Sequence, residues 1–407
     1  MNTETIRKDF PILHAHKNGK PIIYFDNAAT TLKPVQVIDA INHYYLDCPA
    51  NVHRGLHSLS EQASQLYEQS HDKVARFIGA KADEIVFTRN ATESINLAAY
   101  SLLCSGFFKK GDEILLSRLE HHSNLVPWQF VAQKSGAELK FSELNHDFTL
   151  NMNDFENKLS ARTRLVAIAH ASNTVATIMP VKEIGKMAKD NNSLFLVDAA
   201  QSAPHMPLDA KKTNADFIAF SAHKMLGPTG IGALYGNKNA LEDLEPFLFG
   251  GSMIQNVSWH KSTWAKLPDK FEAGTPHIAG AIGFGAAVDY LQKANMQKVR
   301  DHEKELLKHA FSRMKEIPGI KMHCPMDAEK QAGIISFDHP KIEAHDLALA
   351  LDEAANIAVR SGMHCAEPIV SSINPKGLAR ASFYLYNTKE EIDEFAETLE
   401  KICGAFG

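Results

Sequence analysis

The stretch Ala-Asp-Phe-Ile-Ala-Phe-Ser-Ala-His-Lys, residues 215–224, decides the fold of this chain. Its first six residues are mostly apolar, which is typical of a strand buried on both faces of a parallel sheet. The run stops at Ser221, His223 and Lys224, so a hydroxyl, an imidazole and an amine follow the predicted strand. In an open parallel sheet, ligands bind beyond the carboxyl ends of the strands. We therefore expect a small-molecule site at this edge.

A second apolar run, residues 194–197, ends at Asp198, and Gln201 follows closely. The carboxyl ends of parallel strands share one edge, so we expect Asp198 and Lys224 to lie near each other. This pair suits pyridoxal phosphate, because Lys224 would hold the aldehyde as a Schiff base and Asp198 would keep the pyridine nitrogen protonated. A lysine after a strand is more often simply solvated, so the other motifs must decide between the two interpretations.

The composition excludes several classes of protein. The chain has 407 residues, of which 44% are hydrophobic, so it can bury the cores of two or three domains. The net charge of -5 argues against a nucleic-acid partner. The five cysteines form no Cys-x-x-Cys pair and the histidines show no metal-ligand spacing, so we expect neither a disulfide framework nor a metal. The polar start of the chain and the shortness of its longest apolar stretch, 278–288, lead us to expect a cytoplasmic protein without a membrane partner.

Short apolar runs alternate with amphipathic stretches from residue 21 to about residue 236. We expect strands at 84–88, 113–117, 165–170, 194–198, 217–221 and 231–235, and helices at 60–77, 92–104 and 181–189. This alternation predicts the α/β class, with a mostly parallel sheet flanked by helices. The irregular stretch 248–276 breaks the pattern, and such a long loop is usually functional or lies against a partner subunit.

A smaller α+β domain is expected after the helix at 278–293. Its predicted helices cover 299–317 and 344–355, its strands 320–323, 333–337, 357–361 and 379–386, and its last helix opens with a capping box from Thr388 to Glu391. We therefore divide the chain into a large domain, residues 18–293, and a small domain, residues 294–407, which residues 1–17 are expected to join.

Two polar clusters follow predicted strands of the large domain. Asn90-Ala91-Thr92-Glu93 precedes a helix, where free backbone N–H groups favour a phosphate, although the same four residues also form an ordinary helix cap. Glu120-His121-His122-Ser123-Asn124 places an imidazole where it could stack on a flat ring, although a solvated loop explains it equally well.

The small domain contributes a thiol and a guanidinium. Cys365 lies in a loop between strands, where a reactive thiol would be placed, although most cysteines are inert and buried. Arg380 occupies a polar position of an alternating strand, so it could bind a carboxylate through two parallel hydrogen bonds or form a surface ion pair.

Motifs from the whole chain combine with these clusters in a specific order and spacing. They are Tyr24-Phe25-Asp26-Asn27-Ala28-Ala29, Asn51-Val52-His53-Arg54-Gly55, Thr92-Glu93-Ser94-Ile95-Asn96, Glu120-His121-His122, Val197-Asp198-Ala199-Ala200-Gln201, the stretch 221–232, Phe271-Glu272-Ala273-Gly274-Thr275-Pro276, and Arg360-x-Gly362-x-His364-Cys365. In this order they resemble the Suf-type (group II) cysteine desulfurases and selenocysteine lyases, which are class V aminotransferase-family enzymes of pyridoxal phosphate fold type I.

The resemblance implies an enzyme that converts L-cysteine to L-alanine, forms a persulfide on Cys365 and passes the sulfur to an acceptor protein for iron–sulfur cluster assembly. It leaves L-selenocysteine open as a substrate. It also implies a homodimer. Only 15 residues (380 minus 365) separate Cys365 from Arg380, so the loop has little reach and the acceptor is expected to approach the pocket.

The resemblance also implies a role for each site residue. Lys224 would carry the cofactor, Asp198 would pair with its ring nitrogen, and Gln201 would contact its phenolic oxygen. His121 would stack on its ring. The phosphate would be held by Thr92, Ser221 and His223 and by Thr275 from the partner subunit. Asn173, Arg380 and Arg360 would bind the substrate.

Two alternatives remain open from the sequence. The chain could be another class V enzyme, an aminotransferase or a kynureninase-like hydrolase, in which Cys365 is incidental, or it could be a non-enzymatic scaffold on the same fold. Ala176, Met363 and the pair Asn90-Ala91 depart from the usual residues of the family, which leaves the local loop geometry and the substrate preference open.

Overall fold

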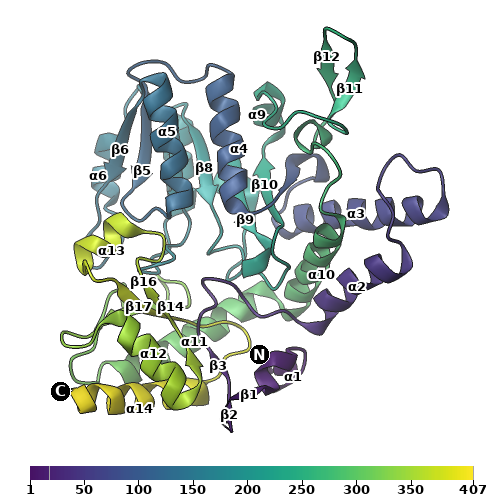
Figure 1. The fold of residues 1–407 in the computed structure, drawn as a ribbon. Coiled ribbons are helices and arrows are strands. Elements are labelled where there is room, and N and C mark those ends of the chain that lie inside the picture. Colours follow the sequence, from purple (N-terminus) through teal and green to yellow (C-terminus); the bar gives the residue numbers. More distant parts are fainter. Residues whose placement is uncertain (18, 407) are drawn as a thin grey trace.

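A seven-stranded sheet forms the centre of the computed structural model, which describes residues 1–17 and 19–406 (Figure 1). In spatial order its strands are β4 (Ile85–Thr88), β10 (Gly232–Gly236), β9 (Phe217–Ser221), β8 (Leu194–Asp198), β7 (Thr163–Ala169), β5 (Glu113–Ser117) and β6 (Glu138–Ser142). The strands from β9 to β6 are mutually parallel, whereas β10 is antiparallel to both β9 and β4. The predicted α/β class with a mostly parallel sheet is therefore confirmed.

Alternate residues of the strands pack into separate cores on the two faces of the sheet. In β9, Ile218 and Phe220 join one core, and Phe217 and Ala219 join the other. Burial on both faces explains why the run 215–220 is mostly apolar rather than alternating. Each large apolar side chain that is fully buried in this way contributes roughly 1.5–3 kcal/mol.

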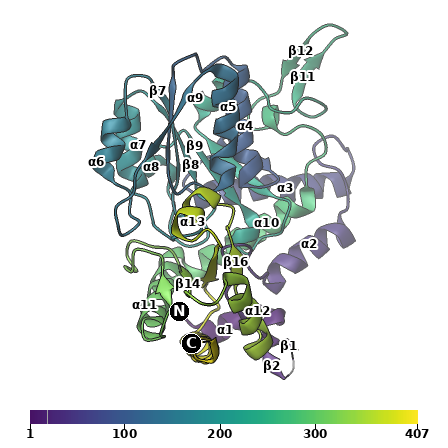
Figure 2. The same cartoon turned by 60° about the vertical axis from the view of Figure 1, so that its left-hand side comes forward.

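Helices cover both faces (Figure 2). The core of Ile218 includes residues of α3 (Ser58–Phe77), α7 (Val181–Asp190) and α10 (Ile278–Ala294), whereas the core of Phe217 includes residues of α4 (Ala91–Cys104) and α5 (Val126–Ser135). The three predicted helices of the first part agree with α3, α4 and α7 to within two residues at each end.

A smaller antiparallel sheet lies beside the large one. Its order is β13 (Lys321–Met322), β14 (Ile334–Asp338), β17 (Leu378–Ser382) and β16 (Arg360–Gly362), and it packs with α11 (Met296–Met314), α12 (Ala344–Ala355) and α14 (Lys389–Phe406). Ile23 and Phe25 join the core of this sheet, and β3 (Ile23–Tyr24) pairs in parallel with β15 (Ile357–Ala358). The division into residues 18–293 and 294–407 stays a proposal, and its outermost residues, 18 and 407, lie outside the described residues.

The other elements are short, apart from the helix α2. They are α1 (Thr3–Arg7), α2 (Val35–Asp47), α6 (Met152–Lys158), α8 (Ala210–Thr213), α9 (Lys238–Asp243), α13 (Glu367–Ile373), β1 (His16–Lys17), β2 (Lys20–Pro21), β11 (Ile254–Val257), β12 (Ser262–Trp264), and the 3-10 turns η1 (Pro11–His14), η2 (Ala82–Glu84), η3 (His122–Asn124), η4 (Ala222–Lys224) and η5 (Asp269–Phe271).

The structure corrects three expectations, and it contains a strand that was not predicted. The stretch 248–276 contains a hairpin, β11–β12, which projects from the rest of the molecule (Figures 1 and 2). The strand expected at 357–361 is two short strands, β15 and β16, in different sheets, and the strand expected at 379–386 ends at Ser382. The edge strand β6 was not predicted, since its side chains are mostly half-buried or exposed and leave no buried run in the sequence.

The capping box predicted at the last helix is present, because the Thr388 N–H donates to Glu391 Oε2 at 3.1 Å and the Glu391 N–H donates to Thr388 Oγ1 at 3.2 Å. Within residues 1–17 and 19–406, every helix is too short or too polar to span a bilayer.

Candidate active site

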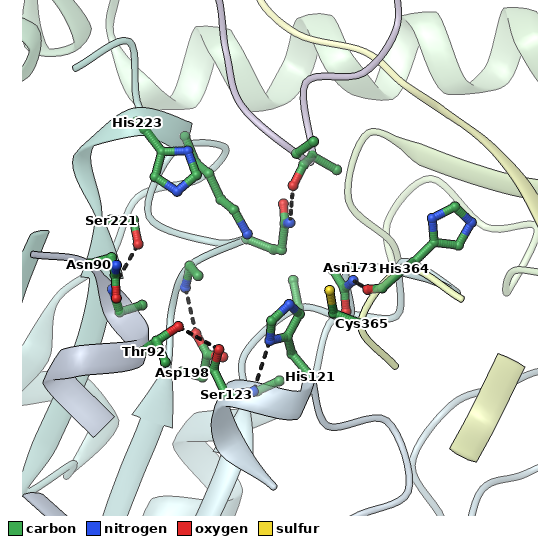
Figure 3. Close-up of a pocket in the computed structure, with 18 of the residues that line it drawn as sticks. Asn90, Thr92, His121, Ser123, Asn173, Asp198, Ser221, His223, His364 and Cys365 are labelled. Atoms are coloured by element: carbon green, nitrogen blue, oxygen red, sulfur yellow. Dashed lines mark hydrogen bonds between the residues drawn. The ribbon is translucent and has the colours of Figure 1, made fainter. Parts of the chain in front are cut away.

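A cavity of about 220 Å³ lies at the carboxyl ends of β7, β8 and β9 (Figure 3). Its lining includes nearly all the residues that the sequence singled out: Thr92, His121, Asn173, Asp198, Gln201, Ser221, His223, Lys224, Arg360, Cys365 and Arg380. Residues from both sheets therefore meet around one space. Thr275 is the exception, since it lines a different cavity of this chain and its Oγ1 accepts a hydrogen bond from Asn51 Nδ2 at 3.4 Å.

Asp198 and Lys224 are the charged pair in the interior of the cavity. Asp198, the last residue of β8, is 5% exposed, and its Oδ1 accepts a hydrogen bond from the Ala200 N–H at 2.9 Å. Burial raises the pKa of Asp198, although the Ala200 N–H and the charge of Lys224 oppose the rise. Burial lowers the pKa of Lys224 to about 8, although Asp198 opposes this fall. The Lys224 amine can therefore gain or lose a proton near neutral pH.

The start of α4 forms the polar wall beside this pair. The Glu93 N–H donates to Asn90 Oδ1 at 2.9 Å, so the cap interpretation of residues 90–93 is correct. The Ala91 N–H donates to Ser221 Oγ at 2.8 Å, which leaves the Ser221 hydroxyl proton free for a second partner. Thr92 also lines the cavity, so a capped helix start and an anion-binding wall coexist here.

The backbone next to Lys224 is held by residues 30–33, for which no role was predicted from the sequence. The His223 carbonyl accepts hydrogen bonds from the Thr31 N–H at 3.0 Å, Thr30 Oγ1 at 3.0 Å and Lys33 Nζ at 2.8 Å. Burial lowers the pKa of Lys33 to about 7 and that of His223 to about 4. These contacts bring together residues about 190 positions apart, so no local pattern could have revealed them.

His121 presents a neutral ring to the cavity. Its Nδ1 accepts a hydrogen bond from the Ser123 N–H at 3.0 Å, so the proton of the neutral ring lies on Nε2. Burial, followed by the charge of Lys224, lowers the pKa of His121 to about 3. An uncharged flat ring is compatible with stacking on another ring, and the solvated-loop alternative does not describe this residue.

Glu120, the residue before His121, fastens this loop to the sheet. Its carboxylate accepts hydrogen bonds from Ser117 Oγ at 2.5 Å, Asn124 Nδ2 at 2.6 Å and the Ala169 N–H at 2.9 Å. Glu120 is only 3% exposed, and this burial raises its pKa to about 7. No role was predicted for Glu120, although a carboxyl group three residues after the end of a predicted strand, at Ser117, was a usable signal.

Arg380 stands at the small-sheet side of the cavity. It is 2% exposed, its Nη1 donates to the Asn173 carbonyl at 2.8 Å, and its Nη2 pairs with Asp26 Oδ1 at 3.3 Å. Arg380 Nε and Asn173 Oδ1 are buried without a partner. Unpaired buried polar atoms at a cavity wall are costly, and a bound carboxylate beside them would satisfy the guanidinium. Arg380 is therefore not in a surface ion pair.

Cys365 is exposed and lines the cavity, so it is not one of the buried cysteines. The carbonyl of the preceding residue, His364, accepts a hydrogen bond from Asn173 Nδ2 at 2.7 Å, as Figure 3 shows. The Cys365 carbonyl accepts one from the His122 N–H at 2.8 Å. The cysteine loop is thus fastened to both neighbouring walls of the cavity.

Comparison with known proteins agrees with this geometry. Residues 23–395 match the family model for class-V aminotransferases. The chain is 48% identical to a probable cysteine desulfurase of Halalkalibacterium halodurans over 100% of this chain and 99% of that one, and 43% identical to a cysteine desulfurase of Haloferax volcanii over 98% and 96%.

Solved structures give the same result. An apo cysteine desulfurase of Thermococcus onnurineus NA1 is 43% identical and superposes with a TM-score of 0.94 over 99% of this chain and 98% of that one. A cysteine desulfurase of Escherichia coli is 33% identical, with a TM-score of 0.91 over 100% of both chains. The α/β architecture is thus that of the fold type I pyridoxal phosphate enzymes, and the chain belongs to the class-V aminotransferase family, alongside its cysteine desulfurases.

Proposed function

We propose that this chain is a pyridoxal phosphate-dependent cysteine desulfurase that converts L-cysteine to L-alanine and leaves a persulfide on Cys365. The observation that carries the proposal is the meeting, in one cavity, of the half-buried Lys224, whose pKa is lowered, and the exposed Cys365 thiol. Relatives named cysteine desulfurases that match this chain over nearly its whole length support the same reaction.

The residues of the cavity fit the cofactor that the family uses. Bound pyridoxal phosphate supplies an aldehyde that reacts with amines and a ring that accepts electrons. The Asp198 carboxylate suits the ring nitrogen, and the start of α4 with Ser221 suits the phosphate. Gln201 donates through Nε2 to the Ala28 carbonyl at 2.7 Å, while its Oε1 is buried without a partner, so this amide still has hydrogen-bonding capacity.

The roles of the other side chains follow from their protonation and placement. Lys224 Nζ takes the proton from the substrate Cα, since its lowered pKa makes a neutral amine available. Arg380 binds the substrate carboxylate, with Asn173 and Arg360 beside it at the cavity wall. The neutral ring of His121 covers one face of the site.

The sulfur step balances without an outside oxidant. The Cys365 sulfur, as thiolate, attacks the substrate sulfur, so one S–S bond forms while the substrate Cβ–S bond breaks. Cβ receives the electron pair of that bond and a proton, and becomes the methyl group of alanine. The two thiol hydrogens of the reactants therefore end on the methyl group and on the persulfide.

The persulfide must then leave Cys365. The loop is held by Asn173 and His122, so the sulfur cannot travel far and an acceptor protein would come to the exposed thiol. We propose iron–sulfur cluster assembly in the cytoplasm as the use of this sulfur, following the resemblance to Suf-type enzymes. L-selenocysteine is a further proposed substrate, which a comparison of kcat/KM for the two amino acids tests directly.

We further propose a homodimer. Large apolar side chains are exposed on α2, before α3 and at the tip of the β11–β12 hairpin: Leu46 is 80% exposed, Leu56 is 99% and Trp259 is 99%. These elements lie on one side of the molecule in both views (Figures 1 and 2), and exposed apolar surface of this kind is typical of a subunit interface. Thr275, which lies outside the site of its own chain, would then reach the phosphate of the partner's site.

The decisive experiment measures alanine release from L-cysteine by the purified protein and by Cys365→Ser. A desulfurase loses sulfur transfer in this variant, whereas an aminotransferase or a kynureninase-like hydrolase keeps its turnover. A protein that purifies without the yellow colour of a bound cofactor, and that releases no alanine, would support the non-enzymatic scaffold instead.

A further inference from the structure

The loop that carries the thiol has an unusual backbone. His364 and Cys365 have φ angles of 50° and 54°, so two consecutive residues with side chains lie in the left-handed region. Such a conformation is strained for a residue with a side chain and persists only where the surrounding structure enforces it. Contacts outside the loop must therefore hold it in place.

Three residues hold the loop, two of them before the thiol in the sequence and one after it. Asn173 and Leu378 hold His364: Asn173 Nδ2 donates to its carbonyl at 2.7 Å, and the Leu378 carbonyl lies 2.9 Å from its Nε2. His122 holds the other side. Its backbone N–H donates to the Cys365 carbonyl at 2.8 Å, and its Nε2 accepts a hydrogen bond from the Glu367 N–H at 3.0 Å.

The ring of His122 takes the place of a missing helix cap. Helix α13 begins at Glu367, and its N-cap residue, Ala366, has no side chain that could accept a hydrogen bond from the first N–H groups. Those groups are normally satisfied by an Asn, Asp, Ser or Thr at that position. Here the acceptor comes from His122, a residue 245 positions earlier in the chain. The bond requires His122 Nε2 to be unprotonated, with the proton of the neutral ring on Nδ1.

We propose that His122 is the positioning residue of the cysteine loop: it fixes the backbone at two points that follow the Cys365 side chain, the Cys365 carbonyl and the Glu367 N–H, and so sets the direction from which the thiol attacks. The inference rests on the proposed function, in which Cys365 is the nucleophile. Because His121 lines the cofactor cavity and His122 is the next residue, the thiol is held relative to the large sheet and not only to its own small sheet. A fixed approach matters, because a displacement of about 1 Å from the productive geometry can cost on the order of 100-fold in rate.

Hydrogen exchange of the Glu367 amide in the purified enzyme tests this directly. His122→Phe keeps a planar ring and the backbone N–H but removes the acceptor, whereas His122→Gln places an amide oxygen close to the position of Nε2. Glu367→Gln is the matched control, because it changes only the side chain of the donor residue. We expect about fivefold faster exchange of this amide in His122→Phe, the factor for one net hydrogen bond. His122→Gln should exchange like the wild type, and so should Glu367→Gln.

The kinetic readout separates positioning from folding. We expect His122→Phe to lower kcat for alanine release by at least about fivefold while KM for cysteine changes less than about twofold, and His122→Gln to recover most of kcat. Equal exchange in His122→Phe and the wild type, or equal losses of kcat in His122→Phe and His122→Gln, would overturn the proposal.

One measurement needs no variant. The amide of Glu367 is the first of its helix and would exchange freely without an acceptor, so in the wild-type protein it must be protected. An unprotected Glu367 amide refutes the role of His122 even if His122→Phe fails to fold. Absence of alanine release by the wild type would instead refute the proposed function, and the exchange data would still decide whether His122 holds the loop.

Discussion

The buried carboxyl of Glu120 should make the stability of the protein depend on pH in a predictable direction. Burial raises its pKa from the ordinary value of 4.5 to about 7. The folded protein therefore binds this proton more tightly than the unfolded chain. The stabilisation is fully present below pH 4.5 and is lost as the pH rises to about 7. The difference between the two pKa values, at about 1.36 kcal/mol for each pKa unit, gives a loss of about 3 kcal/mol.

Glu120→Gln removes the titration and keeps the shape of the side chain. The free energy of unfolding, measured by urea for the protein freed of its cofactor, is compared between wild type and variant at pH 5 and pH 8. Gln cannot match every hydrogen bond of the neutral carboxyl group, but Gln does not titrate, so this difference is the same at both pH values and cancels. The stability of the wild type relative to the variant should thus fall by about 2 to 3 kcal/mol from pH 5 to pH 8.

A matched control is Glu138→Gln, which alters an exposed carboxylate on the neighbouring strand β6. Its effect on the free energy of unfolding should change by less than about 0.5 kcal/mol over the same range. A difference between wild type and Glu120→Gln that is flat, or that grows as the pH rises, would refute the reasoning about Glu120.

Three further predictions concern the site and the assembly. Lys224→Ala should purify without covalently bound cofactor, so borohydride treatment followed by mass spectrometry should find no cofactor adduct; an adduct on another lysine would contradict the assignment. Mass spectrometry after incubation with L-cysteine should find one extra sulfur atom, on Cys365, in the wild type and none in Cys365→Ser. A persulfide on Cys104 instead would be evidence against Cys365 as the residue that takes up the sulfur. Leu56→Asp should shift the protein from dimer to monomer in light scattering because it puts a charge into the proposed interface, whereas Leu349→Asp, at an exposed leucine of α12, should leave the dimer intact.

The strands that build the site could be recognised because their signal is local. The run 215–220 and the run 194–197 are buried on both faces, and each stops at the residue that enters the cavity. The rule that ligands bind at the carboxyl ends of parallel strands then places Asp198 and Lys224 together from the sequence alone. Elements without such a buried run, β6 and the β11–β12 hairpin, were not recognised for the same physical reason: half-exposed strands carry no continuous apolar pattern.

The amino-acid sequence by itself therefore determined the α/β class, the edge of the sheet that carries the site, and the identity of most residues that line the cavity. Only the tertiary structure decided how those residues are held. Three sets of contacts join segments more than 180 positions apart. They are the hydrogen bonds of residues 30–33 to the His223 carbonyl, the pairing of Asp26 with Arg380, and the hydrogen bonds of His122 beside Cys365. Such contacts depend on how the chain closes long loops around the two sheets. They leave no periodicity or spacing in the sequence, because the hydrogen bonds are made largely by backbone groups that every residue type carries.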